Sequence, residues 1–87
     1  MTYTVQYQTQ ALSDLKKLDK QTQKRIINKV NWLAVNFEQI TPLPLSENWA
    51  GFYKLRVGDY RVIYSLEQTL SILWIEKIGH RRDIYET

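Results

Sequence analysis

The chain has 87 residues, 44% of them hydrophobic, and its 12 Lys and Arg residues against 9 Asp and Glu residues give a formal net charge of +3. This length supplies one modest hydrophobic core, so we expect a single domain over residues 1–87. The absence of Cys excludes disulfides, thiolate metal sites and a Cys nucleophile, and the excess positive charge favours a polyanionic or acidic partner.

The first part of the chain predicts one strand followed by two helices. Apolar and polar residues alternate over residues 2–7, which is typical of a strand with one buried face. Thr9 is a suitable N-cap for a short helix, and Asp19 is a suitable N-cap for a longer helix that extends to about residue 37. Each predicted helix carries its apolar residues on one stripe, so the two helices should form a hairpin that packs on a sheet.

The second part of the chain predicts three further strands. Two prolines within residues 38–48 exclude a helix interior and a central strand, so we expect a loop there. Gly58 and Asp59 lie between two β-branched and aromatic runs, as in a hairpin with a two-residue loop. Residues 70–78 form the most continuously apolar run, which favours a central strand. The order β-α-α-β-β-β predicts an α+β fold with an antiparallel sheet, the first strand at an edge and both helices on one face.

The predicted hairpin gathers positive charge on one face. If Gly58 and Asp59 form the loop, Arg56 lies opposite Arg61 and Lys54 lies on the same face, because side chains alternate with a period of two. Such residues often only solvate a surface. However, like charges directly opposite each other destabilise a sheet by up to roughly 1 kcal/mol, so packing does not explain this pair.

The C-terminal segment adds further candidate functional residues directly after the last strand. It contains His80, Arg81, Arg82 and Tyr85. A strand joined by a short turn usually pairs with its predecessor, so we expect the end of this strand to meet the cationic face of the hairpin.

The remaining features favour packing over chemistry. Trp32, Trp49 and Trp74 are expected to pack in or against the core rather than stack on bases. The chain has one His and scattered acids, so we expect no metal site and no cofactor. No apolar run approaches the roughly 20 residues of a membrane span, and the N-terminus lacks the regions of a signal peptide, so we expect a cytoplasmic protein without a membrane partner.

With these residues laid out, the chain resembles the RelE/ParE superfamily of toxins from type II toxin–antitoxin modules. The resemblance runs nearly end to end, and its specific parts are the run YKLRVGDYRVIY at residues 53–64 and the run GHRRDIY at residues 79–85. It implies the microbial RNase-like RelE fold and a metal-independent endoribonuclease that cleaves mRNA in the ribosomal A site. It also implies a cognate antitoxin partner, with operator DNA contacted only through that antitoxin.

The resemblance also implies roles for individual residues. The implied catalytic residues are Lys54, Arg56, Arg61, Arg81 and Tyr85, with His80 as a possible auxiliary residue. The implied RNA-binding residues are Lys54, Arg56, Arg61, Arg81 and Arg82. Arg56 stands where RelE has a second Lys, and the substitution keeps the charge but gives a poorer proton acceptor.

Attack by the 2′-hydroxyl needs a group that accepts its proton, and it needs positively charged groups beside the phosphate oxygens. The cations can supply the charge stabilisation. Lys54 is the favoured base because neighbouring cations favour a neutral amine, and Tyr85 and His80 are the other candidates. Two alternatives have different functions: a ParE-like toxin that inhibits DNA gyrase without nuclease activity, and a member that only binds an antitoxin as a corepressor. The basic residues together with the near-terminal Tyr favour the RelE branch.

Overall fold

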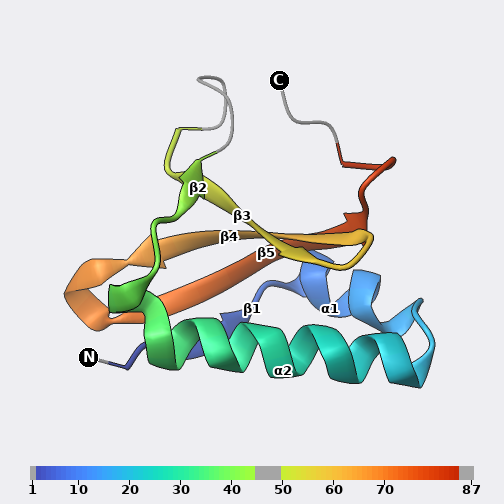
Figure 1. Ribbon diagram of the computed structural model, residues 1–87, viewed down its shortest axis with the longest axis horizontal. Helices are drawn as coiled ribbons and strands as arrows, with labels where there is room; N and C mark the ends of the chain where they lie inside the picture. Colours follow the sequence, from blue (N-terminus) through green and yellow to red (C-terminus); the bar gives the residue numbers. More distant parts are fainter. Residues whose placement is uncertain (1, 45–49, 85–87) are drawn as a thin grey trace.

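The computed structural model describes residues 2–44 and 50–84, and its helices and strands follow the predicted order with one short strand added. Figure 1 shows both helices on one side of the sheet, and in the described part of the chain no helix covers the other face, which we call the open face. This arrangement confirms the predicted α+β fold. The elements are β1 (Thr4–Tyr7), α1 (Thr9–Lys16), α2 (Lys20–Asn36), the 3-10 turn η1 (Phe37–Gln39), β2 (Leu43–Pro44), β3 (Phe52–Val57), β4 (Tyr60–Glu67), the 3-10 turn η3 (Gln68–Leu70) and β5 (Ile72–His80).

The sheet has the strand order β1-β5-β4-β3-β2. Strands β3, β4 and β5 form the predicted antiparallel meander, and β1 lies at an edge. However, β1 pairs with β5 in parallel, with Val5 opposite Leu73, so the sheet is mixed and the prediction of an antiparallel sheet is wrong for this pair. Two neighbouring strands that are joined by a short turn must be antiparallel. Strands β1 and β5 are far apart in the chain, so no turn sets their relative direction.

The short strand β2 lies within the predicted loop. Leu43 pairs with Lys54 of β3, and β2 forms the other edge of the sheet. An edge is where a proline-containing strand is tolerated, because only one side of it has to take part in hydrogen bonding. On the other side of the sheet, β5 lies between β1 and β4, so it is an interior strand, and β4 holds the middle position.

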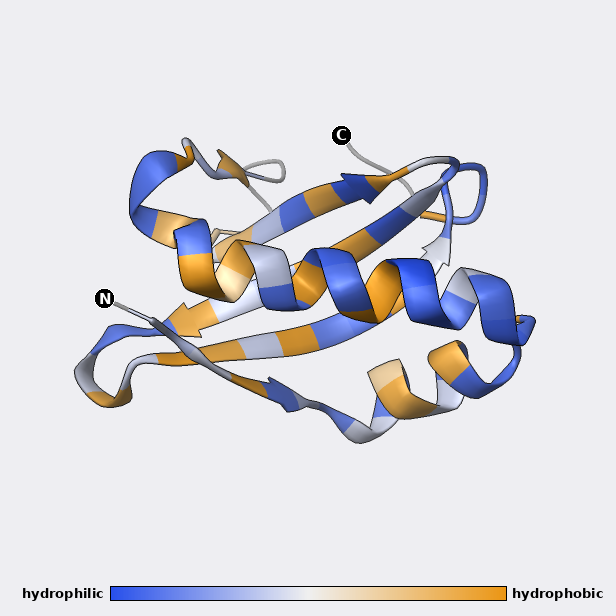
Figure 2. Cartoon of the chain, turned by 60° about the horizontal axis from the view of Figure 1, so that its bottom comes forward, coloured by the Kyte–Doolittle hydropathy of each residue, from blue (hydrophilic) through white to orange (hydrophobic). Residues whose placement is uncertain are grey.

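The core lies between the two helices and the sheet. Its buried residues are Ala11, Leu15, Ile26, Val30, Leu33, Ala34, Val57, Val62, Tyr64, Leu73, Ile75 and Ile78. Figure 2 shows hydrophobic residues recurring along α2 and alternating with polar ones along the strands. Burial raises the pKa of Tyr64 to about 12.

The helix starts agree partly with the predicted caps. The side chain of Asp19 accepts a hydrogen bond of 2.8 Å from the backbone N–H of Thr22, as predicted, and this bond lowers the pKa of the Asp19 carboxyl. The first helix is capped instead by Gln8, one residue before the predicted Thr9, without a side-chain hydrogen bond. No helix in the described part of the chain is long and apolar enough to cross a membrane.

The Trp residues do not behave alike. Trp74 is half-buried on the open face and donates a hydrogen bond of 3.0 Å to Glu67. Trp32 is 46% exposed, so of the two positions expected for it, in the core or packed against it, the position in the core is wrong. The buried stripe of α2 is filled by Val30, Leu33 and Ala34, which leaves Trp32 on the side of the helix. Trp49 lies outside the described residues.

Candidate functional site

The predicted cationic face exists and is the open face of the sheet. Arg56 lies directly opposite Arg61, and Lys54 lies opposite Ile63, as the two-residue loop requires. Residues next to them in the strands, such as Val62, are buried under the helices, so the three cations point away from the core. Arg56 is exposed, whereas Lys54 and Arg61 are half-buried.

An irregularity in β5 adds a fourth cation to this face. Tyr64 lies opposite Ile75 while its neighbour Ile63 lies opposite Lys77, so Glu76 is the extra residue of a β-bulge. Both Ile75 and Ile78 are therefore buried although they are three residues apart. Regular alternation from Ile75 would have turned Lys77 toward the core. Sequence reasoning missed Lys77, and the signal that could have revealed it was the three-residue spacing of the two isoleucines.

Gly79 brings the C-terminal turn back onto the same face. It lies opposite Arg61 in the sheet. A Cβ atom added to Gly79 would lie 3.2 Å from the Cδ1 atom of Ile84, so the missing side chain makes room for this contact. Ile84 is only 8% exposed. The end of β5 therefore meets the hairpin, as predicted, and residues 81–84 are held beside Arg61.

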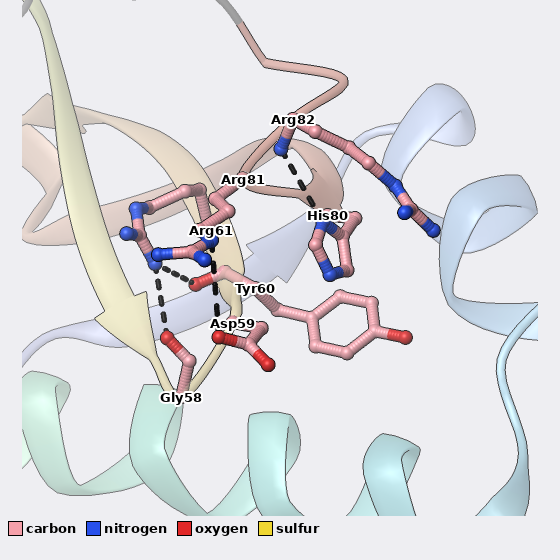
Figure 3. A network of polar contacts seen from close by, with 7 residues as sticks. All are labelled: Gly58, Asp59, Tyr60, Arg61, His80, Arg81 and Arg82. Carbon is pink, nitrogen blue, oxygen red and sulfur yellow. Dashed lines mark hydrogen bonds and ion pairs between the residues drawn. The ribbon is translucent and has the colours of Figure 1, made fainter.

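The hairpin turn contacts two of the predicted catalytic arginines (Figure 3). The Nη1 atom of Arg61 donates hydrogen bonds of 3.0 Å and 2.9 Å to the carbonyl oxygens of Gly58 and Tyr60. The backbone N–H of Arg81 donates a bond of 2.7 Å to the carbonyl oxygen of Asp59. The Arg81 Nε atom also lies 3.9 Å from the Asp59 carboxylate. The turn therefore brings Arg61 and Arg81 to one place.

The Asp59–Arg81 ion pair contributes little to the stability of the fold. Both side chains are more than 60% exposed, at 69% for Asp59 and 64% for Arg81. Exposed ion pairs of this kind typically contribute about 0–1 kcal/mol. The shorter backbone bond between the same two residues is the firmer link.

His80 and Arg82 belong to the other side of the strand. His80 lies opposite Tyr60, whose side chain is on the helix-facing side, and the two rings meet edge to face with centroids 5.4 Å apart. The backbone N–H of Arg82 donates a bond of 3.3 Å to the Nδ1 atom of His80. Both residues line a pocket that they share with Asp14 and Lys17 of α1 and with Lys77 of β5. Figure 3 shows them on the opposite side from Arg61 and Arg81.

The structure therefore brings together Lys54, Arg56, Arg61 and Arg81, and it adds Lys77. It does not bring His80 or Arg82 to this group. Tyr85 lies outside the described residues, so its predicted role stays a prediction. In the described part of the chain, no group of three His, Asp or Glu side chains could hold a metal ion. A face of this composition suits a polyanion.

Comparisons with known proteins agree with this arrangement. A sequence profile for "ParE toxin of type II toxin-antitoxin system, parDE" matches residues 5–85. The chain is 35% identical over 89 residues to Toxin RelG of Mycobacterium tuberculosis, covering 98% of each protein. The chain belongs to the RelE/ParE superfamily of type II toxins.

Solved structures of this superfamily share the fold. A chain of the RelBE2 toxin–antitoxin complex from Mycobacterium tuberculosis matches with a TM-score of 0.83 at 27% identity, covering 93% of this toxin and 100% of that chain. A chain of the RelE–RelB complex from Pyrococcus horikoshii matches with a TM-score of 0.70, also at 27% identity, covering 93% and 97%. A chain of the chromosomal ParDE system of Pseudomonas aeruginosa matches with a TM-score of 0.73 at 15% identity, covering 91% and 96%. The fold is thus common to RelE and ParE toxins and does not separate them.

Proposed function

We propose that this toxin is a ribosome-dependent endoribonuclease that cleaves mRNA in the A site and so inhibits translation. The observation that supports this proposal is the convergence of Arg56, Arg61 and Arg81 with Lys54 on one open face. Two arginines directly opposite each other destabilise a sheet, so we expect them to have a role other than stabilising the fold. Stabilisation of the negative charge that develops on a phosphate during cleavage is a role that fits their number and position.

The proposed reaction is attack by the 2′-hydroxyl on the adjacent phosphate, with no metal. The 2′-oxygen forms a bond to phosphorus, the bond to the 5′-oxygen breaks, and the products are a 2′,3′-cyclic phosphate and a 5′-hydroxyl. Arg61 and Arg81 stabilise the pentavalent intermediate, and Lys54 takes the proton from the 2′-hydroxyl. Tyr85 is proposed to give a proton to the departing 5′-oxygen, and the proton held by Lys54 then returns through water to Tyr85. Positioning of the message by ribosomal RNA would compensate for the lack of a strong base.

A cognate antitoxin is the proposed protein partner. Two of the similar solved structures are toxin–antitoxin complexes, which supports this proposal. We expect an acidic segment of the antitoxin to cover the cationic face, because complementary charge speeds association. Contact with operator DNA would come only through the antitoxin, and a ribosomal target places the toxin in the cytoplasm.

The test is single-turnover cleavage of mRNA programmed on ribosomes with the toxin saturating. Arg81→Ala should lower the rate by about two orders of magnitude, because loss of one preorganised charge at a developing anion typically costs roughly 3 kcal/mol. Ribosome binding should change far less, since one phosphate contact among many is lost. Arg82→Ala is the matched control, because it removes the neighbouring arginine from the other side of the strand.

Tyr85→Phe extends this test because it removes only the hydroxyl and keeps the ring. A lowered rate with unchanged binding would support a role in proton transfer. Wild-type rates in both Arg81→Ala and Tyr85→Phe would refute the assignment.

The second candidate function is inhibition of DNA gyrase without nuclease activity. The match of residues 5–85 to a ParE toxin profile favours it. Expression of the toxin without its antitoxin separates the two functions, because a nuclease arrests translation and a gyrase inhibitor triggers a DNA damage response. A supercoiling assay with purified gyrase gives the same distinction in vitro.

A further inference from the structure

An open pocket of about 570 Å³ lies beside the cationic face, between α2 and the end of β3. Its size falls in the range of roughly 300–1,000 Å³ that is typical of ligand sites, although it is open rather than enclosed. The lining residues are Arg25, Asn28, Lys29, Trp32, Arg56, Val57 and Gly58. Among these described lining residues, three are cations and none is an acid. We call this site the α2–β3 pocket.

Trp32 gives this pocket an aromatic surface that the core does not use. Its side chain is 46% exposed, and the Nζ atom of Lys29 lies 3.9 Å from the ring centroid. Such a cation–π contact holds the ammonium group over one face of the ring, so a base would stack on the other face or take the place of the ammonium group. An exposed aromatic ring next to cations is the combination that proteins use to stack a base and hold its phosphate.

Arg25 connects the pocket to the turn that contacts the catalytic arginines. A Cβ atom added to Gly58 would lie 2.9 Å from the Nη2 atom of Arg25, so the guanidinium group reaches from α2 to the hairpin turn. The same Gly58 accepts the hydrogen bond from Arg61 on the open face. Arg56 lines the pocket and is also part of the cationic face. Positive charge is therefore continuous from the open face, around the edge of β3, to α2.

We infer that the α2–β3 pocket binds single-stranded RNA, with a base stacked on Trp32 and phosphates held by Arg25 and Lys29. This inference rests on the proposed function for the identity of the polymer, and it extends the RNA path beyond the cleavage site. An open pocket suits one nucleotide of a longer strand. An acidic peptide would use the cations but would leave the exposed indole ring without a role, so RNA accounts for more of the lining.

The experiment measures binding of a fluorescein-labelled 2′-O-methyl octauridylate, which cannot be cleaved, to the purified toxin over a range of salt concentrations. The test variant is Arg25→Gln/Lys29→Gln. The matched control is Lys20→Gln/Lys24→Gln, which removes the same charge from the same helix but outside the pocket. A plot of the logarithm of the binding constant against the logarithm of the salt concentration has a negative slope. The magnitude of this slope should decrease by about 1.4 in the test variant, or about 0.7 for each lost phosphate contact, and by much less in the control.

The aromatic part is tested with Trp32→Ala and Trp32→Phe. Stacking of one base contributes roughly 1–3 kcal/mol, so Trp32→Ala should weaken binding at least about fivefold. Trp32→Phe keeps a stacking surface and should restore most of the affinity. Equal slopes in the two double variants, or unchanged affinity in Trp32→Ala, would overturn the inference. The inference would also be overturned if the Arg25→Gln/Lys29→Gln or Trp32→Ala variant no longer co-purified with the antitoxin but bound RNA as wild type does. The pocket would then be a binding site for the antitoxin.

The outcome is separable from that of the proposed function. Binding is measured without cleavage, so the pocket can be confirmed even if the toxin does not cut mRNA on ribosomes. Conversely, an active nuclease whose test and control variants bind the octauridylate equally well would keep its proposed function and lose this site.

Discussion

Gly58 is the residue at which the geometry of the hairpin turn can be tested most directly. Its φ angle is +59°, and Asp59 after it is not in the positive-φ region, which is the pattern of a type II′ hairpin loop. An L-residue at this loop position, which a type II′ turn normally reserves for Gly, costs on the order of 1–3 kcal/mol. Replacing Gly by Ala also restricts the unfolded chain, which offsets roughly 0.4–1 kcal/mol of that cost. Gly58→Ala should therefore lower the free energy of unfolding by about 1 kcal/mol.

The nearby Arg25 should add little to this cost. The new Cβ atom would lie 2.9 Å from the Nη2 atom of Arg25, which is the far end of an exposed and flexible side chain that can move aside. Gly51 provides the control, since its φ angle is +88° and, among the described residues other than its chain neighbours, no atom lies within 4 Å of an added Cβ. Gly51→Ala should cost about as much as Gly58→Ala, because both costs arise from the backbone.

Equilibrium unfolding in urea gives these free energies. The variants are Gly58→Ala, Gly51→Ala, Arg25→Ala and the double variant Gly58→Ala/Arg25→Ala. We expect the two changes at 58 and 25 to be additive within about 0.5 kcal/mol. A coupling energy above about 1 kcal/mol, or a cost of Gly58→Ala well above that of Gly51→Ala, would show that the clash with Arg25 dominates and would refute the reasoning.

Three further predictions concern the core, a helix cap and the site. Leu33→Ala should cost about 2–5 kcal/mol in urea unfolding because Leu33 is 1% exposed, whereas Val35→Ala on the same helix, 61% exposed, should change stability by less than about 0.5 kcal/mol. Asp19→Ala should destabilise the toxin at neutral pH, and the difference from wild type should shrink as pH falls below the ordinary Asp pKa of 3.8, because the folded-state pKa is lowered. A pH-independent difference would contradict this. Asp59→Asn should leave stability within about 1 kcal/mol and lower single-turnover cleavage less than Arg81→Ala does, since the 2.7 Å backbone bond to Arg81 remains.

Local sequence patterns determined the parts of this protein that depend on neighbours in the chain. The two-residue loop at Gly58 and Asp59 sets the register of β3 and β4, so the opposition of Arg56 and Arg61 could be predicted. The 3.6-residue period located both helices, and Asp19 marked the start of the second helix. The end of β5 could be placed beside the hairpin because strands joined by short turns pair with each other.

The tertiary structure decided the features that depend on contacts between distant residues. No turn sets the direction of β1, so only the packed sheet shows that it runs parallel to β5. The bulge at Glu76 reverses the alternation of β5, and this reversal turns Lys77 outward. His80 lies on the helix-facing side for the same reason, because side chains at successive strand positions point to opposite faces and a one-residue shift exchanges them.

The surroundings of Trp32 and Ile84 also depended on the tertiary structure. Trp32 is exposed because other residues of α2 already fill the buried stripe, and Ile84 is buried because Gly79 leaves room for it. Hydrophobicity alone predicts that both residues prefer burial, and it does not rank them when the core has a limited volume. Close packing determines which of the two residues is buried, because burial depends on which side chains fit together and not only on the hydrophobicity of each residue.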